Sequence, residues 1–403
     1  MTFACSLRQD WCLRFGTVPS VSRVPKNPKV VAPDAPSGAT YLGQLQRIGR
    51  DAGLDAIGVA PAGVMHRARQ QLQDREDRHL TNGLKFTYLR PERSTHPELL
   101  VDGARTVIVG VRSYAYDSPI DIDNGRLHAD IARYAWDDHY GKLKASLTQV
   151  AAQLRRDGHR ATVFADDNSI VDREIAWLAG LGWYGRNANL LIPGKGSMFV
   201  IGCIVTTADL PLGEEVPDGC GTCSRCLPAC PTSAIIEPGV IDANRCLSWL
   251  LQKPGVFDAR HREALGGRIY GCDECQMVCP PTKKFGTQPM SFDDLVTRVD
   301  VLTLLSLDDN ALDASCDRWY VADRDMTWVR RNLLIVLGNS GSPSDEETVE
   351  TLRRYLSHER DILRAHAVWA AARLGLTHLL YFDDPSPIVV TELENLPPLR
   401  GDL

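Results

Sequence analysis

The spacing of the cysteines is the feature of this sequence that most restricts its fold. Eight of the twelve cysteines lie between Cys220 and Cys279. Clustering of this kind indicates metal ligation, unless the protein is secreted and forms disulfides. The first run starts at Cys220 with the spacing C-x2-C-x2-C-x3-C-P, which is typical of bacterial ferredoxins.

A second run, C-x2-C-x3-C-P, starts at Cys272, and Cys246 lies between the two runs. Two four-iron clusters need eight thiolates, which is the number present. In two-cluster ferredoxins the last cysteine of a run ligates the other cluster. If that crossover holds, the ligand sets are Cys220, Cys223, Cys226 and Cys279 for one cluster, and Cys230, Cys246, Cys272 and Cys275 for the other.

Zinc sites and structural disulfides are the alternatives for these cysteines. Tetrahedral zinc favours two separated pairs, whereas the first run crowds four sulfurs onto one turn, so we favour the clusters. Cys203 and Cys316 are predicted to be packing residues. Cys5 and Cys12 lie in an N-terminal extension and are given no role.

The composition indicates an ordinary globular protein, with 44% apolar and 24% charged residues. A formal charge of −6 argues against a uniformly basic surface for nucleic acid, but allows a local basic patch. No stretch approaches the roughly 18 apolar residues of a membrane helix, and residues 1–31 lack the apolar core of a secretory signal. We therefore expect a cytoplasmic protein that does not span a membrane.

Periodicity divides the chain into two regions. A helical pattern over residues 42–48 is followed by strand patterns at 56–60, 106–111, 161–165 and 198–206. Helical patterns at 139–156 and 172–181 lie between them, which indicates an α/β or α+β fold. After residue 285 the strand signals stop. There, residues 330–341 resemble residues 364–375 at an offset of 34, which predicts a short α-helical repeat pair.

Beyond the cysteines, several motifs resemble the epoxyqueuosine reductases, cobalamin-dependent iron–sulfur enzymes that complete the queuosine base of tRNA anticodons. The resemblance covers residues 41–375. It includes Arg93-x3-Pro97-x2-Leu100, the segment AGLGW-x-GRN at 179–187, Gly196-Ser197, the segment YGCDECQ at 270–276, and Arg331-Asn332. The glycine motif makes the match more specific than the cysteines alone.

The resemblance implies an α+β fold, and together with the composition of the two ends it divides the chain into five segments. These are an extension over 1–40, a cobalamin-binding catalytic α/β domain over 41–210, a ferredoxin-like two-cluster domain over 211–290, HEAT-like helical repeats over 291–382, and an acidic tail over 383–403 that we expect to be solvated. The implied cofactors are two [4Fe-4S] clusters and cobalamin. We expect a monomer that receives electrons from an external low-potential donor.

The glycine-dense turn is predicted to border the cobalamin, since glycine lets backbone approach a large flat cofactor. The alternative is that these glycines only end a helix and start a turn. The residues that the resemblance suggests as cobalamin contacts are Arg93, Asp166, Arg173, Gly182, Trp183, Asn187, Gly196 and Ser197.

The family uses an aspartate as proton donor, and Asp138 is our assignment, with Asp137 as its rival. The segment departs from the family pattern, because a glycine is missing and the Tyr-His order is reversed at His139-Tyr140. To donate a proton near neutral pH, Asp138 needs a pKa raised by burial. The alternative role for either aspartate is to cap the following helix.

The implied substrate is an epoxide in a tRNA anticodon loop, reduced to an alkene with loss of water. Suggested tRNA contacts are Lys283 and Lys284 beside the clusters, and Arg330 and Arg331 on the helical repeats. A solvated helix face is the alternative for each.

Two other functions compete. Reductive dehalogenases also combine cobalamin with two clusters, and they resemble exported proteins with a twin-arginine signal that is missing here. The other rival is a non-catalytic electron-transfer module.

Overall fold

The computed structural model describes residues 38–116, 125–285, 295–380 and 383–400. A four-stranded antiparallel sheet organises the N-terminal part, with the strand order β1-β2-β7-β4. Its strands are β1 (Ala56–Pro61), β2 (Thr106–Ser113), β4 (Ala161–Ala165) and β7 (Phe199–Thr206). The predicted strands therefore all form, each with bounds within two residues of the pattern. Cys5, Cys12 and most of the predicted 1–40 extension lie outside the described residues.

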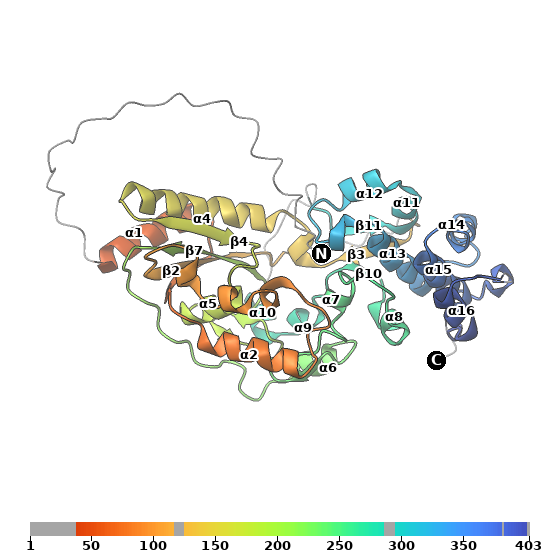
Figure 1. The fold of residues 1–403 in the computed structure, drawn as a ribbon, viewed down its shortest axis with the longest axis horizontal. Coiled ribbons are helices and arrows are strands. Elements are labelled where there is room, and N and C mark those ends of the chain that lie inside the picture. Colours follow the sequence, from red (N-terminus) through yellow and green to blue (C-terminus); the bar gives the residue numbers. More distant parts are fainter. Residues whose placement is uncertain (1–37, 117–124, 286–294, 381–382, 401–403) are drawn as a thin grey trace, which may run out of the picture. The chain divides into compact units, whose positions relative to one another are not determined.

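Helices cover both faces of this sheet (Figure 1). On one face, α1 (Gly38–Asp51) and α4 (His139–Arg156) form a core with Ile108 and Ile204. On the other, α2 (His66–Asp77) and α5 (Asp172–Leu178) pack over Val109 and Cys203. Because β2 and β7 are buried on both faces, they have continuous apolar sequences instead of alternating ones.

The segment that carries the cysteines is built from short elements. Its helices are α6 (Cys226–Ala229), α7 (Leu247–Leu250), α8 (Ala259–Leu265), α9 (Glu274–Met277) and α10 (Pro280–Phe285). Its strands are β8 (Ile235–Glu237), β9 (Val240–Ile241) and β10 (Arg268–Tyr270). β10 pairs in parallel with β3 (His128–Ile131), which pairs antiparallel with β11 (Arg298–Asp300). The expectation that strands end at residue 285 is therefore wrong, because β11 joins a sheet whose other strands lie far away in sequence.

The remaining short elements connect these parts. They are η1 (Phe86–Tyr88), α3 (Pro91–Ser94), η2 (Pro97–Leu99), η3 (Arg133–Ala135), β5 (Trp183–Tyr184), β6 (Leu190–Leu191), η5 (Ala322–Arg324) and η6 (Thr377–Leu379).

The C-terminal part is helical apart from β11. Its helices are α11 (Val301–Ser306), α12 (Asp309–Ser315), α13 (Thr327–Ser340), α14 (Glu346–Leu356), α15 (Asp361–Arg373) and α16 (Pro387–Glu394). The two predicted repeat helices are α13 and α15, which pack against each other. Gly338 makes a close crossing possible, since a Cβ there would lie 2.6 Å from the Trp369 ring. The HEAT-like classification of this region stays a prediction.

The described part of the acidic tail, residues 383–400, contains the helix α16, so the end is not solvated throughout, although most of its residues are exposed. Within α16, the buried Glu392 accepts hydrogen bonds of 2.7 and 3.0 Å from the guanidinium of Arg262. Asp384, just before α16, pairs with Arg364 at 2.6 Å. The arginines of neighbouring helices neutralise these acids, which sequence counting treated as exposed. Residues 38–403 form a single contact unit, and the predicted segment boundaries within it stay predictions.

Candidate active site

The eight thiols fall into two spatial groups. Burial raises the pKa of Cys226, and the neighbouring charges that raise it further belong to Cys279, Cys220 and Cys223. Burial likewise raises the pKa of Cys275, with added contributions from Cys272, Cys246 and Cys230. The thiol neighbours of Cys226 and of Cys275 thus form two groups with the same members as the two ligand sets expected from the crossover, and the ligand sets themselves stay a prediction. The helices α6 and α9, which carry one run each, pack together and bring the sets side by side.

Hydrogen bonds to sulfur distinguish these thiols from ordinary buried cysteines. The Ala234 amide donates to Cys230 Sγ at 3.2 Å, and Asn189 Nδ2 lies 4.0 Å from Cys275 Sγ. Donors of this kind favour the thiolate form and tune an iron–sulfur cluster. In the part of the chain that the structure describes, no three His, Cys, Asp or Glu side chains are arranged around a single metal ion. Two groups of four thiols supply the donors that two four-iron clusters need.

Cys203 and Cys316, the predicted packing residues, are both buried and free. Cys203 belongs to the core beneath α5, and Cys316 belongs to the core of the helical region.

The second cysteine set lies against the N-terminal part. Gln276, next to Cys275, donates through Nε2 to the Tyr114 hydroxyl at 3.1 Å and to the Ser197 carbonyl at 2.9 Å. The Asp273 carboxylate accepts the Arg133 amide at 2.7 Å, just before α4 begins. These bonds tie the second set to β2 and to the N-terminal end of α4.

Arg173 is an exposed cation in the first turn of α5. Burial raises the pKa of Tyr114, Tyr140 and Cys246, which belong to three separate segments. The charge of the Arg173 guanidinium acts in the opposite direction on all three, with a smaller effect. Arg173 is exposed and makes no hydrogen bond or ion pair with any described residue. An exposed cation therefore lies within electrostatic range of both tyrosines and of Cys246 in the second cysteine set.

Asp172 lies beside Arg173 at the start of α5. Burial raises its pKa to about 8, and the charge of Arg173 opposes this increase while Asp166 and Asp167 add to it. The carboxyl has no hydrogen-bond donor among the described residues. Tyr140 is its neighbour from α4, since the charges of Asp172 and Asp166 add to the effect of burial in raising the Tyr140 pKa. Sequence reasoning missed Asp172, although its place at a helix start between two other acidic residues was a visible signal.

Asp138 has the capping role that was the alternative for it. It is the N-cap of α4, it is exposed, and its Oδ1 accepts the Gly141 amide at 2.8 Å. Its rival Asp137 forms an ion pair with Lys142, and that pairing lowers its pKa although burial acts in the opposite direction. Asp138 is therefore not buried in this conformation, although proton donation near neutral pH would require burial of its carboxyl group.

His139 is the buried residue of the same turn. Its ring lies between Tyr114 and Tyr116, with centroid distances of 5.8 and 5.5 Å. Neither ring nitrogen makes a hydrogen bond of normal geometry within the described chain. Burial lowers its pKa to about 4, although Asp137 acts in the opposite direction, so the imidazole is neutral at physiological pH.

The glycines predicted to border the cobalamin face protein instead. A Cβ at Gly182 would lie 2.0 Å from the Leu191 carbonyl oxygen, and one at Gly196 would lie 2.4 Å from Thr282. The reason we gave for these two glycines is therefore wrong: they allow β5 to pair with β6 and let the loop before β7 approach α10.

Two other predicted cobalamin contacts brace the cysteine segment. Asn187 donates to the Cys275 carbonyl at 3.1 Å, and the Ser197 amide donates to Thr282 Oγ1 at 3.2 Å. The buried Trp183 keeps an indole N–H with no partner in the described chain, and such an orphaned donor fits a bound group. Arg93 and Asp166 are exposed.

Two of the four predicted tRNA contacts are buried. Arg331 is 1% exposed and donates to the carbonyls of Lys253 and Gly255 at 2.7 and 2.6 Å. Arg330 pairs with Asp309 at 2.7 Å and is also buried. The prediction for both arginines is wrong, because they hold the helical part to the cysteine segment and to α12. Lys283 and Lys284 are exposed at the end of α10.

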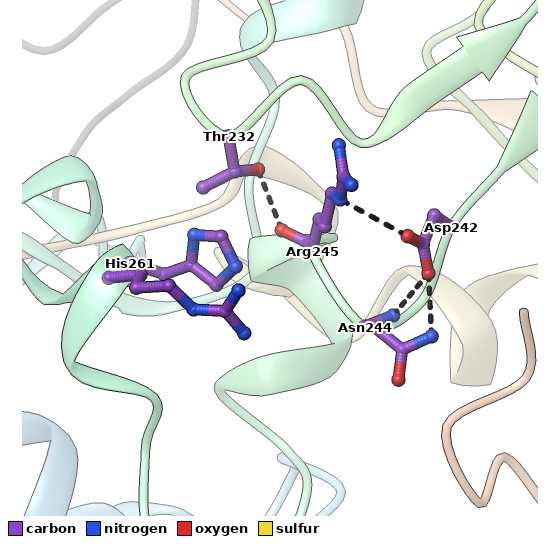
Figure 2. A pocket seen from close by; sticks show the side chains of 6 residues that line it. Thr232, Asp242, Asn244, Arg245 and His261 are labelled. Atoms are coloured by element: carbon purple, nitrogen blue, oxygen red, sulfur yellow. Dashed lines mark hydrogen bonds and ion pairs between the residues drawn. The ribbon is translucent and has the colours of Figure 1, made fainter.

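A polar pocket of about 420 Å³ is lined by Thr232 and Arg245, which lie close in sequence to Cys230 and Cys246. The Thr232 hydroxyl donates to the Arg245 carbonyl at 2.6 Å, which links the segment after Cys230 to the one before Cys246. Figure 2 shows the Asp242 carboxylate bonded to both Arg245 and Asn244. It pairs with Arg245 Nε at 3.2 Å and accepts a hydrogen bond from Asn244 Nδ2 at 2.7 Å. These groups satisfy one another, so the pocket supports the cysteine loop.

Comparison with known proteins identifies the family. A model described as "Epoxyqueuosine reductase QueG, DUF1730" matches residues 94–167, and a "4Fe-4S double cluster binding domain" matches residues 219–282. The epoxyqueuosine reductase of Xanthomonas campestris pv. campestris is 33% identical over 71% of this chain and 82% of its own length. The chain belongs to the epoxyqueuosine reductase family. The epoxyqueuosine reductase of Bacillus anthracis is 27% identical over 80% of this chain and 86% of its own length.

Solved structures share the fold. The epoxyqueuosine reductase of Streptococcus thermophilus superimposes with a TM-score of 0.80 and 25% identity, covering 88% of this chain and 98% of that one. Another epoxyqueuosine reductase, solved with an epoxyqueuosine-modified tRNA-Tyr stem loop, has a TM-score of 0.80 and 23% identity over 89% of this chain and 98% of its own. The chain is thus a member of an oxidoreductase family with a mixed α+β fold, and its residues fit two [4Fe-4S] clusters and cobalamin.

Proposed function

We propose that this chain reduces epoxyqueuosine in the anticodon loop of tRNA to queuosine. The observation that carries the proposal is the meeting of two all-thiol sets with a region of free polar groups, in a chain of this family. Opening the epoxide to an alkene consumes two electrons and two protons, and the epoxide oxygen leaves as water. In our proposal the thiol sets hold the clusters that carry the electrons, and the polar groups donate the protons.

The proposed ligands are Cys220, Cys223, Cys226 and Cys279 for one cluster and Cys230, Cys246, Cys272 and Cys275 for the other. When bound, the clusters carry single electrons and cobalamin supplies a low-valent cobalt able to reduce the epoxide. The second set lies nearer the reacting region, because Cys246 senses the charge of Arg173 and Cys275 adjoins Gln276, which bonds Tyr114.

The first set is nearer the surface. Its loop contains the exposed Thr222, Ser224 and Arg225. We infer that an external one-electron carrier donates to this set, and that the second set passes electrons onward.

Arg173, Trp183, Arg93 and Asp166 are the proposed contacts of this chain to cobalamin. Arg173 offers a free cation and Trp183 an unpartnered N–H. Asn187, Gly182, Gly196 and Ser197 contribute by fixing the backbone that holds these groups against the cysteine segment.

Asp172 is the proposed proton donor, in place of Asp138. A general acid must be protonated near neutral pH and must reach the substrate. Asp172 meets the first condition through its burial, and its lack of a protein partner leaves its proton available. Tyr140 lies within electrostatic range of Asp172, and because burial raises its pKa it stays a neutral phenol beside the reacting region. Asp138 acts in our proposal as the cap that fixes the start of α4, and therefore the position of Tyr140.

We further propose that the chain works in the cytoplasm as a monomer. No helix among the described residues is long and apolar enough to cross a membrane.

The test is reduction of tRNA that carries epoxyqueuosine, by protein purified and reconstituted without oxygen. The expected product is a nucleoside lighter by one oxygen atom, detected by mass spectrometry. A corrin absorption spectrum in the same preparation separates this function from that of an electron-transfer module. Unchanged tRNA with both cofactors bound and reduced would reject the proposal.

A further inference from the structure

The segment over residues 85–93 is an exposed, basic and partly aromatic surface, of which the predictions included only Arg93, as a cobalamin contact. Lys85, Arg90 and Arg93 are exposed, and none makes a side-chain hydrogen bond or ion pair with another described residue. The acid of this loop, Glu92, is paired with Arg69 at 2.5 Å. The loop therefore presents three uncompensated positive charges on a chain whose total is −6.

Aromatic rings hold one end of this loop. The Phe86 ring lies 5.8 Å from the Trp249 ring of the cysteine segment and 5.1 Å from the Tyr320 ring of the helical part. Trp249 is fixed in turn, because its indole N–H donates to the Asn82 carbonyl at 3.1 Å. Tyr320 remains 43% exposed, so one face of the group is open.

The other end of the loop reaches the proposed reaction region. The Ser94 carbonyl accepts the Val171 amide at 3.0 Å, directly before Asp172 and Arg173. Tyr88, in the middle of the loop, has a pKa raised by burial and lowered by the charges of Arg75 and Arg173. The basic loop is thus a continuous path from the open Tyr320 ring to the start of α5.

We propose that residues 85–93, with Tyr320, form the surface that grips a single-stranded RNA loop and guides it to Asp172 and Arg173. Unpaired cations suit the phosphates of such a loop, and exposed aromatic rings suit its unstacked bases. A double helix offers no free base faces to Tyr320, whereas the unstacked bases of a single-stranded loop do. This inference rests on the proposed function and names the surface that serves it.

The experiment measures binding of an anticodon stem-loop RNA that lacks the modified base, by fluorescence anisotropy over a range of salt concentrations. The variant Lys85→Ser/Arg90→Ser removes two cations and leaves Arg93, a proposed cofactor contact, in place. The slope of log affinity against log salt should fall by about 0.7 for each cation removed, or about 1.4 in total. The matched control is Arg47→Ser/Lys144→Ser, which removes two exposed, unpaired cations of α1 and α4 and should leave the slope unchanged.

Stacking is tested separately from charge. Tyr320→Ala should weaken binding about 5- to 100-fold with an unchanged salt slope, and Tyr320→Phe should bind as the natural protein does. An equal slope for the loop variant and its control would overturn the proposal. Equal binding of a fully paired duplex RNA, or no effect of Tyr320→Ala, would overturn its single-stranded part.

These outcomes are independent of the reduction assay. If the natural protein binds RNA through this loop but leaves epoxyqueuosine intact, the proposed function fails and this surface stands. If it reduces epoxyqueuosine and the loop variant binds with full affinity, the function stands and this surface fails.

Discussion

Replacing Asp172 with Asn removes a carboxyl group whose charged form the fold disfavours. The pKa of Asp172 is about 8, against 3.8 for an ordinary aspartate. At about 1.4 kcal/mol for each pH unit, ionising this group in the native protein costs on the order of 6 kcal/mol more than in the unfolded chain. At about pH 7 most molecules should therefore carry the proton that we assign to catalysis.

The pH dependence of turnover follows from this value. Between about pH 7 and pH 9 the protonated fraction falls roughly tenfold, and single-turnover reduction should fall with it. Stability shifts in the same direction. Because the folded state holds a proton that the unfolded chain has released above about pH 4, the free energy of unfolding decreases as pH rises through about 8. Asp172→Asn should lose turnover, keep both cofactors, and lack this contribution to the pH dependence of stability.

The assay combines infrared spectroscopy with single-turnover kinetics. The natural protein should show a protonated carboxyl band at neutral pH that disappears with a midpoint near 8. Asp172→Asn should lack the band, and Asp138→Asn should keep both the band and the turnover. Normal turnover in Asp172→Asn, combined with loss of turnover in Asp138→Asn, would refute the reasoning and return the donor role to the helix cap.

Two further predictions concern the buried arginine and the cysteines. Arg331→Met should lower the free energy of unfolding by about 3–5 kcal/mol, because several buried carbonyls lose their donor. Urea denaturation measures this loss. An equally large loss in the exposed control Arg353→Met would count against the prediction. Cys226→Ser and Cys275→Ser should each disturb a different cluster, so their electron paramagnetic resonance spectra should differ, whereas Cys203→Ala should keep the full iron content. Identical spectra for the two serine variants would contradict the ligand sets.

Local sequence patterns predicted the elements whose neighbours lie close in sequence. The helix at 139–156 and the strand at 161–165 form with the predicted bounds, because their periodicity is strong and Asp138 caps the helix. The strand β11 was missed, since three residues show no period and only pairing with β3 makes them a strand. Long-range pairing is not visible in a local pattern.

Charge misled the predictions where tertiary contacts neutralise it. Arg331 looks like an exposed helix cation in the sequence, yet its guanidinium is enclosed by backbone carbonyls of the cysteine segment. Glu392 looks like part of a solvated tail, yet it meets the buried Arg262. Asp172 shows the opposite effect. Its sequence neighbours suggest an ordinary charged aspartate, but burial raises its pKa to about 8 and favours the protonated form. Spacing predicts two ligand sets whose members also lie close together in the structure, but only the fold shows which polar groups lie near them.

The most direct measurement of the central claim is a single-turnover reaction between the cofactor-replete, pre-reduced protein and a stem-loop RNA that carries epoxyqueuosine. Our account predicts queuosine, with one oxygen atom lost and two electrons withdrawn from the protein for each base converted. Oxidation of the protein without loss of oxygen from the RNA, or an intact epoxide with both clusters and the corrin reduced, would contradict it.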